Sequence, residues 1–229
     1  MSLFSVQPYR GVSLPERPDQ SDADLIAQAA AFQAAMGDRR SVRDFTDRPV
    51  PEAVIATAIA TAGGAPSGAN HQPWHFAATQ DADKKAKLRA AAETEERDFY
   101  AGGAGAEWLA ALEPIGTDAR KPHLTVAPWL IVVFAQRWST TPEGVRFKNY
   151  YVPESVGIAT GFLIASLHHA GLSCLTHTPN PMKFLNGLCQ RPNSEKPVMI
   201  LAVGHPAPDA QVPAAAIQKK PLEEIMTVL

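Results

Sequence analysis

The 229-residue sequence contains few cysteines, few charged residues and no long apolar run. Its two cysteines, Cys174 and Cys189, form no C-x-x-C pair, which excludes a disulfide-rich scaffold and a zinc knuckle. No segment approaches the roughly 18 consecutive apolar residues of a membrane-spanning helix. The first twenty residues carry proline and charge where a signal peptide would be apolar. These absences predict a soluble cytoplasmic protein with no membrane partner.

Charged side chains make up 19% of the residues, against a usual fraction of about 25%. The 21 lysines and arginines nearly balance the 23 acidic residues, so the formal net charge is −2. This balance excludes a strongly basic chain that binds nucleic acid and a highly acidic disordered chain. The 45% hydrophobic fraction supports a folded core.

Several enzyme classes are excluded because their defining motifs are missing. The sequence has no G-x-S-x-G nucleophile elbow, no Walker phosphate loop and no G-x-G-x-x-G that follows a strand. Of its seven histidines, His71 and His75 have H-x-x-x-H spacing, but they fall in a predicted loop and strand and not on a helix face, so we expect no metal site.

Hydrophobic periodicity and turn residues predict one α+β domain over residues 1–229. Helices are expected at 22–36, 51–63, 81–99 and 154–170, and strands at 74–79, 130–135, 172–176 and 198–203. The glycine-rich run 101–106 is expected to be a hinge that holds no helix. The proline-rich ends, an arm at 1–20 and an extension at 205–229, are expected to be extended.

A cluster of basic residues and one serine follows the first predicted helix: Arg39, Arg40, Ser41 and Arg43. Guanidinium groups bind phosphate or carboxylate through paired hydrogen bonds, and a serine hydroxyl adds a donor. The cluster therefore suits a compact anion such as a nucleotide phosphate. Three aspartates nearby nearly neutralise the local charge, so a solvated loop remains the alternative.

Two further segments offer hydrogen-bonding groups beside small or proline residues. The loop 65–73 contains Ser67 and Asn70 among residues small enough to let a flat ligand approach the backbone, although on its own an ordinary turn explains it better. The segment 176–179 places two threonines around His177 at the end of a predicted strand, where ligand-facing groups are common. His177 itself fits a packed or capping histidine better than a general base.

Taken in order, RRSVRDF at 39–45, APSGANHQPW at 65–74 and Thr-x-Thr-Pro at 176–179 resemble the FMN-dependent nitroreductase superfamily, over roughly residues 35–229. Three residues make the sequence similar to the iodotyrosine deiodinase branch in particular: Glu96 and Tyr100 in one helix, and Lys121 further on. Trp108 is in register with that branch, and KKPLEEIM at 219–226 is similar to its C-terminal segment.

The resemblance implies a nitroreductase-like fold, with a central mixed sheet flanked by helices, in a domain-exchanged homodimer with FMN at the interface. It also implies an active-site lid over residues 96–121. The residues that match the family's FMN site are Arg39, Arg40, Ser41, Arg43, Pro66, Ser67, Thr176, His177, Thr178 and Lys219. Among them Thr178 would place its hydroxyl near the flavin N5 and act in catalysis. Lys219 stands where the family usually has arginine.

The same resemblance implies a site for the zwitterion of an amino acid. Glu96 would bind the α-ammonium group, Lys121 the α-carboxylate, and Tyr100 would donate to the carboxylate while its ring covers the substrate; Ala69 would approach the substrate. Because Lys121 lies beyond the glycine-rich hinge, we expect lid closure to bring it in. Without the resemblance, these residues read as a solvated helix face with unrelated charges.

The expected function is FMN-dependent reductive dehalogenation of halogenated tyrosine, with electrons from NAD(P)H or a reductase. One alternative is a general NAD(P)H-dependent nitroreductase that acts on nitroaromatics or quinones. A non-enzymatic flavin-binding sensor or storage protein is a third class, which stoichiometric FMN without turnover would indicate.

Overall fold

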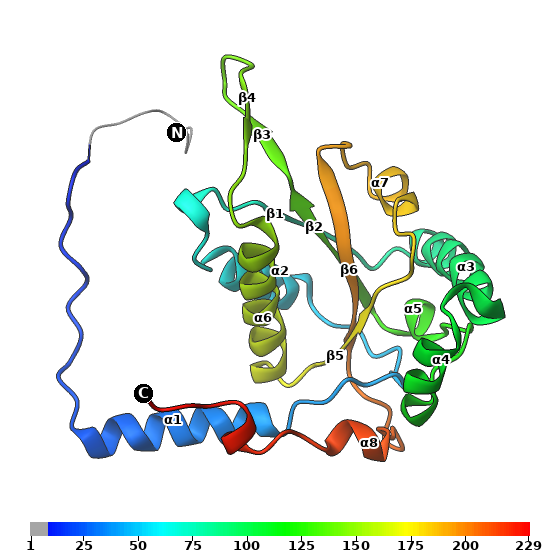
Figure 1. Cartoon of the computed structure of the whole chain (residues 1–229), viewed down its shortest axis with the longest axis horizontal. Coiled ribbons are helices and arrows are strands. Elements are labelled where there is room, and N and C mark those ends of the chain that lie inside the picture. Colours follow the sequence, from blue (N-terminus) through cyan, green and yellow to red (C-terminus); the bar gives the residue numbers. More distant parts are fainter. Residues whose placement is uncertain (1–8) are drawn as a thin grey trace.

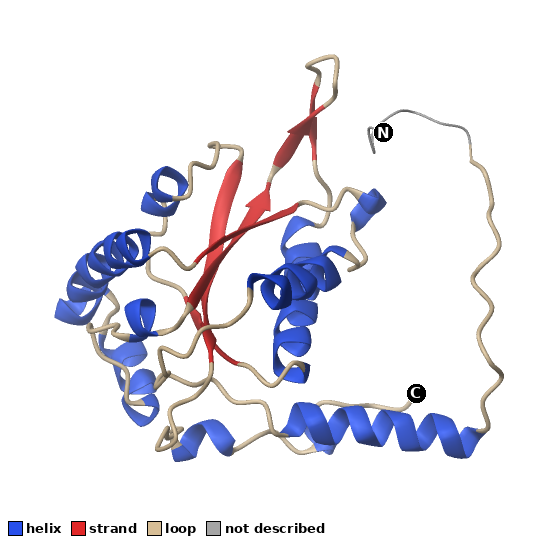
Figure 2. Ribbon diagram, turned by 180° about the vertical axis from the view of Figure 1, so that it is seen from behind, coloured by secondary structure: helices blue, strands red, loops and turns tan. Residues whose placement is uncertain are grey.

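The computed structural model describes residues 9–229 and has a four-stranded sheet between two layers of helices (Figures 1 and 2). The strand order is β1 (Trp74–Thr79), β2 (Trp129–Gln136), β6 (Glu195–Gly204) and β5 (Ser173–His177). All neighbouring strands in this sheet run antiparallel. A mixed sheet also contains parallel pairing. Here the parallel pairing is an isolated bridge between Ser41 and Cys174, at the edge strand β5. The four predicted strands are confirmed, and β6 begins three residues earlier than expected.

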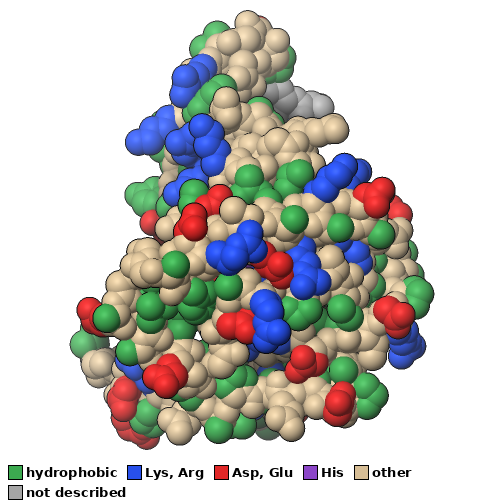
Figure 3. Space-filling view, turned by 90° about the vertical axis from the view of Figure 1, so that its right-hand side faces the viewer, with side chains coloured by type: hydrophobic (Ala, Val, Ile, Leu, Met, Phe, Trp, Pro, Cys, Tyr) green, Lys and Arg blue, Asp and Glu red, His purple; other side chains and the backbone are tan. Residues whose placement is uncertain are grey.

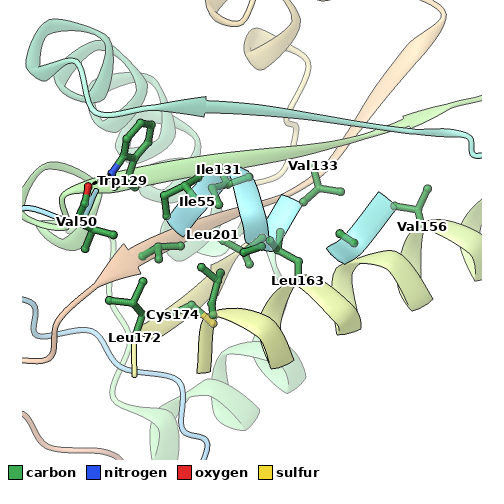
Figure 4. Packing of buried hydrophobic residues seen from close by; sticks show 14 of the residues in the cluster. Val50, Ile55, Trp129, Ile131, Val133, Val156, Leu163, Leu172, Cys174 and Leu201 are labelled. Atoms are coloured by element: carbon green, nitrogen blue, oxygen red, sulfur yellow. Dashed lines mark hydrogen bonds between the residues drawn. The ribbon is translucent and has the colours of Figure 1, made fainter. Parts of the chain in front are cut away.

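Helices cover both faces of the sheet, and the side chains of β2 alternate between them. α2 (Glu52–Gly63) and α6 (Val152–His169) pack against Ile131 and Val133, as Figure 4 shows in part. α3 (Ala82–Asp98), α5 (His123–Val126) and α7 (Phe184–Leu188) cover the face that carries Val132 and Phe134. β2 is therefore buried on both sides, which explains its uninterrupted apolar sequence. The Nε1–H of the buried Trp129 donates a hydrogen bond to the Val50 carbonyl, 2.9 Å away.

α1 (Asp22–Gly37) lies along one edge of the molecule and buries none of its residues (Figure 1). A capping box begins this helix, because the Ser21 hydroxyl accepts from the Asp24 N–H and the Asp24 carboxylate accepts from the Ser21 N–H. Residues 9–20 are exposed and form no helix or strand, as expected for the arm at 1–20; its first eight residues lie outside the described part.

Two expectations for irregular segments are wrong. The glycine-rich run holds helical structure, because the π-helical turn η2 (Phe99–Gly103) continues α3 and α4 (Ala106–Leu112) starts at its end. Positive φ angles at Gly102 (123°) and Gly105 (75°) turn the chain between them. The C-terminal extension is only partly extended, because it contains α8 (Ala214–Ile217) and the 3₁₀ turn η4 (Leu222–Glu224). Figure 1 shows its last part beside α1.

The remaining elements are short and were not expected. β3 (Trp138–Thr140) and β4 (Arg146–Lys148) form a separate antiparallel hairpin that projects from the sheet (Figure 1). The 3₁₀ turns η1 (Gly68–Asn70) and η3 (Glu113–Ile115) lie in the loop 65–73 and after α4. Within residues 9–229, no helix is both long enough and apolar enough to cross a membrane.

Candidate active site

A buried ion pair lies between the last turn of α3 and the start of α5. Glu96 is 8% exposed and Lys121 is 4% exposed, and 3.0 Å separates the Lys121 Nζ from the Glu96 Oε2. The backbone N–H of Lys121 donates to the Glu93 carboxylate at 2.7 Å, which anchors this part of the chain to α3. Two residues that were expected to bind opposite ends of one substrate are therefore in direct contact with each other. Lys121 lies beside Glu96 although the glycine-rich run separates the two residues in the sequence.

Aromatic side chains cover this pair from the segment that follows α3. The Nζ of Lys121 lies 5.4 Å from the centre of the Tyr100 ring. Phe99 meets the rings of Tyr100 and Trp108 edge-on, with centres 5.3 and 5.0 Å apart. Trp108 on α4 thus fixes the π-helical turn over Glu96, since aromatic edge-to-face pairs stabilise such packing. The four-residue spacing of Glu96 and Tyr100 spans the junction of α3 and this turn.

Burial shifts the pKa values of Glu96 and Tyr100. Loss of hydration raises the pKa of Glu96 above its ordinary value, and the hydrogen bond and charge of Lys121 oppose that rise. Burial likewise raises the pKa of Tyr100, so its hydroxyl keeps its proton. Glu96 therefore depends on an adjacent positive charge to stay ionised.

Two buried histidines lie beneath the ion pair. His123 on α5 and His177 at the end of β5 are 5% and 7% exposed, and their rings meet at 75° with centres 5.6 Å apart. Neither Nε2 atom has a hydrogen-bond partner, and that of His177 lies 3.7 Å from the Glu96 Oε1. Burial, with smaller contributions from neighbouring cationic groups, lowers the pKa of His123 to about 4 and that of His177 to about 3. Both rings are neutral at pH 7.

The orientation of His177 differs from the one implied for a flavin contact. Thr176 and Thr178 are exposed, whereas the His177 side chain between them is buried against His123 and Glu96. This alternation is the ordinary geometry of an extended chain, in which neighbouring side chains point to opposite sides. No sequence motif singled out His123, although it lies only two residues after Lys121.

The arginine segment runs beside β5. The Val42 N–H donates to the Cys174 carbonyl at 3.3 Å, next to the bridge at Ser41. Arg40 donates to the carbonyls of Gly37 and Arg39. Within residues 9–229, no ion pair joins the guanidinium of Arg39, Arg40 or Arg43 to a carboxylate within 4.0 Å. The positive charge of Arg43 contributes to lowering the pKa of His177, which indicates that Arg43 lies near the buried cluster.

Other predicted site residues lie apart from this cluster. The Ser67 hydroxyl accepts from the Gln72 N–H at 2.9 Å, and the Gly68 N–H donates to Ser155 at the start of α6. This loop, which includes Pro66 and the exposed Ala69, therefore packs on the face opposite α3. Lys219 is also exposed, and its Nζ donates to the Ala216 carbonyl at 2.9 Å. One chain does not assemble all of the predicted residues.

The surface over α3, α4 and α7 carries lysines, arginines and acidic residues interspersed with one another (Figure 3). In the described part of the chain, no group of three or more His, Cys, Asp or Glu side chains could hold a metal ion.

The model of the nitroreductase family matches residues 36–205, and the chain belongs to this family. The chain is 46% identical to an iodotyrosine deiodinase of the bacterium Haliscomenobacter hydrossis over 222 residues, which cover 96% of each chain. It is 40% identical to the iodotyrosine deiodinase of Hydra vulgaris, over 93% of this chain and 78% of the relative. These relatives confirm the resemblance to the iodotyrosine deiodinase branch.

A solved structure gives the same result for the fold. The chain superimposes with a TM-score of 0.67 on a crystal structure of oxidized iodotyrosine deiodinase bound to FMN and 3-iodo-L-tyrosine, at 30% identity. The match covers 77% of this chain and 90% of that structure. The expected nitroreductase-like α+β fold is therefore confirmed.

Proposed function

We propose that the protein is an FMN-dependent oxidoreductase that removes halogen from halogenated tyrosine. The observation that carries the proposal is the buried Glu96–Lys121 ion pair beneath Tyr100, in a chain whose relatives are iodotyrosine deiodinases. The net reaction takes up two electrons and one proton: the carbon–halogen bond breaks, a carbon–hydrogen bond forms and halide leaves.

The ion pair fits an amino-acid zwitterion because the exchange leaves the site electrically neutral. When the zwitterion enters, Glu96 binds its ammonium group and Lys121 binds its carboxylate, so each buried charge keeps an opposite partner. A ligand that lacks one of the two charged groups leaves Glu96 or Lys121 uncompensated. Truncation of one member of a buried charge pair commonly costs about 2–5 kcal/mol, enough to make the site selective.

The arginine segment fits the phosphate and the polar ring edge of FMN. Arg39 and Arg43 have no carboxylate partner in the described chain and lie beside β5, next to the exposed hydroxyls of Thr176 and Thr178. Arg40 and Ser41 complete this part of the proposed site. FMN, when bound, supplies the electrons for the reduction. Thr178 would hold a proton at its Oγ1 toward the flavin.

We propose that the remaining contacts come from a second copy of the chain. Pro66, Ser67 and Ala69 lie on the face opposite Glu96, so a partner's loop would complete the flavin and substrate sites. The exposed apolar residues of α1 and of the C-terminal extension support such a homodimer. Lys219 would reach the flavin only by leaving its contact with Ala216.

The chain is proposed to act as one domain, with residues 96–121 as a lid. Phe99, Tyr100 and Trp108 would cover the substrate and exclude water, which strengthens the ion pairs beneath. The two unpaired cysteines fit a reducing compartment such as the cytoplasm, where NAD(P)H or a reductase would supply electrons.

A titration of the FMN-loaded protein tests the proposal. Quenching of flavin fluorescence should saturate with 3-iodotyrosine and not with the analogue that lacks the amino group. Equal responses to both ligands would contradict zwitterion recognition and favour a general nitroreductase.

A further inference from the structure

His177 is a buried polar residue that the proposed reaction leaves without a role. Its ring is 7% exposed, and its Nε2 has no hydrogen-bond partner. The same atom lies 3.7 Å from the Glu96 Oε1, just beyond hydrogen-bond distance. Buried polar atoms are normally satisfied, so an orphaned nitrogen aimed at a substrate-binding carboxylate points to a partner gained in another state.

We propose that His177 is a positioning residue for Glu96: when a zwitterion separates Glu96 from Lys121, the His177 Nε2–H donates to the Glu96 carboxylate. This hydrogen bond keeps Glu96 ionised and holds it toward the substrate ammonium. The inference rests on the proposed function, because it assumes that the zwitterion enters between Glu96 and Lys121.

Substrate entry creates the need for this donor. Lys121 now donates to Glu96 at 3.0 Å, and turning toward the substrate carboxylate removes that donor. The ammonium group replaces it at one oxygen, but a buried carboxylate needs donors on both oxygens to remain charged at low cost. A shift of roughly 0.7 Å brings the His177 Nε2 within hydrogen-bond distance of the second oxygen.

The surroundings keep His177 neutral and its ring in place. The ring faces His123 from α5, Lys121 from the turn before α5, and Arg43 from the segment beside β5. A further positive charge among these groups is unfavourable, while Tyr100 covers the site from the lid. His177 therefore offers a donor without changing the charge balance between Glu96, Lys121 and the zwitterion.

The test compares two residues of similar length at this position in the FMN-loaded protein. His177→Gln retains an N–H donor, and His177→Met removes it. Titration with 3-iodotyrosine should show binding about tenfold weaker or worse for His177→Met and within a few-fold of the parent for His177→Gln, because a hydrogen bond to a charged group is lost in only one. A plot of affinity for 3-iodotyrosine against pH should fall on its acid side, which we call the acid limb. This acid limb should move to higher pH in His177→Met alone.

His123→Phe is the matched control, since it alters the neighbouring buried ring without removing the atom that faces Glu96. It should leave the acid limb in place. Equal weakening in His177→Gln and His177→Met, or parental affinity in His177→Met, would overturn the proposal. A parent protein that does not distinguish 3-iodotyrosine from its deaminated analogue would instead overturn the proposed function.

Spectra of the histidine-labelled parent protein provide a second test that does not depend on folding of the variants. The His177 Nε2–H signal should become protected from exchange with water and shift downfield when 3-iodotyrosine is added. An unchanged signal at saturating ligand would overturn the proposal.

Discussion

Glu96 occupies a position where burial disfavours the charged form of its carboxyl group. Burial raises its pKa, and the hydrogen bond and charge of Lys121 oppose that rise. A substrate ammonium group can replace Lys121 in this role, whereas a neutral aromatic ligand cannot. The selectivity for ligands with an ammonium group thus follows from the burial of the Glu96 carboxylate.

Removing the charge of Glu96 should abolish substrate recognition while leaving the cofactor bound. Glu96→Gln should weaken 3-iodotyrosine binding by about 2 kcal/mol or more, roughly 30-fold, because the ammonium group loses its counter-charge. Flavin fluorescence titration measures the affinity, and absorbance measures the FMN content. Glu95→Gln, one residue earlier on α3, is the control and should bind normally; equal losses would refute a specific role.

The same residue should set the pH dependence of binding. Zwitterion binding requires ionised Glu96, and the folded-state pKa of Glu96 is raised, so affinity should fall as the pH falls through that raised value. The acid limb should therefore lie above the ordinary glutamate pKa of about 4.3. Isothermal titrations over a pH series test this, and a limb that persists unchanged in Glu96→Gln would belong to another group.

At the residue scale, the resemblance alone placed Glu96 and Lys121 in one site, and it did not predict the direct ion pair between them. Spacing could not reveal it, since a π-helical turn and two short helices separate the two residues. The sequence favoured a packed histidine at position 177, but the neighbours of its ring depend on how β5 pairs with β6 and faces α5. That information arises only when the sheet is assembled.

At the scale of elements, the start of β6 depends on one buried ion pair. The Glu195 side chain is 3% exposed and accepts from Arg191 at 2.7 and 2.6 Å and from Gln136 at 3.1 Å. These donors, Arg191 foremost among them, more than offset burial and hold the pKa of Glu195 below its usual range.

Arg191→Met should destabilise the protein by about 3 kcal/mol at neutral pH, because it leaves the Glu195 carboxylate buried with too few partners. In the parent, the pKa of Glu195 is lower in the folded than in the unfolded state. The resulting stability is fully present when the pH is above the unfolded-state pKa, and it is lost as the pH falls through the folded-state pKa. The difference between variant and parent should therefore shrink toward acid pH. Denaturant unfolding at two pH values measures this difference in stability. Arg137→Met, which changes a nearby exposed arginine, is the control.

Elements with a strong hydrophobic pattern were predictable, and short ones were not. β2 and α6 pack their apolar side chains on the core, so their sequences are constrained along the whole length. The β3–β4 hairpin buries little, and α4 follows glycines that normally break helices. In α4, the edge-to-face contact between Trp108 and Phe99 stabilises a helix that the local sequence preference does not favour.

For the whole molecule, α1 is the feature that a single chain does not explain. It is a 16-residue helix with no buried residue, and Leu25, Ile26 and Phe32 are 52–70% exposed. Helices of this length are stabilised mainly by packing an apolar face. Figure 2 shows that most of α1 extends beyond the helices that cover the sheet, which fits a surface for the proposed partner chain.

Phe32→Asp should therefore shift the protein toward monomers and weaken FMN binding with it. A charge at the centre of an apolar interface disfavours association by on the order of 2 kcal/mol or more. Sedimentation gives the oligomeric state, and FMN content after gel filtration gives cofactor retention. Val145→Asp, at an exposed apolar site on the distant hairpin, should leave both unchanged. A dimer that persists with Phe32→Asp would contradict the assignment of this face.

The composition alone indicated a folded chain of balanced charge, but it could not show that the proposed site is divided between two faces of the sheet. The positions of Ser67 and Glu96 relative to each other depend on which helices cover which face. The resemblance implied a homodimer, and the division of the proposed site between two faces gives the structural reason for proposing one.

The most direct test of dehalogenation is a single turnover without oxygen. FMN in the protein is reduced with dithionite, excess reductant is removed, and 3-iodotyrosine is added while flavin absorbance and free iodide are followed. We predict that flavin reoxidation releases iodide and tyrosine in equal amounts that match the oxidised flavin. Flavin that stays reduced with 3-iodotyrosine, yet is oxidised rapidly by a nitroaromatic, would contradict the account.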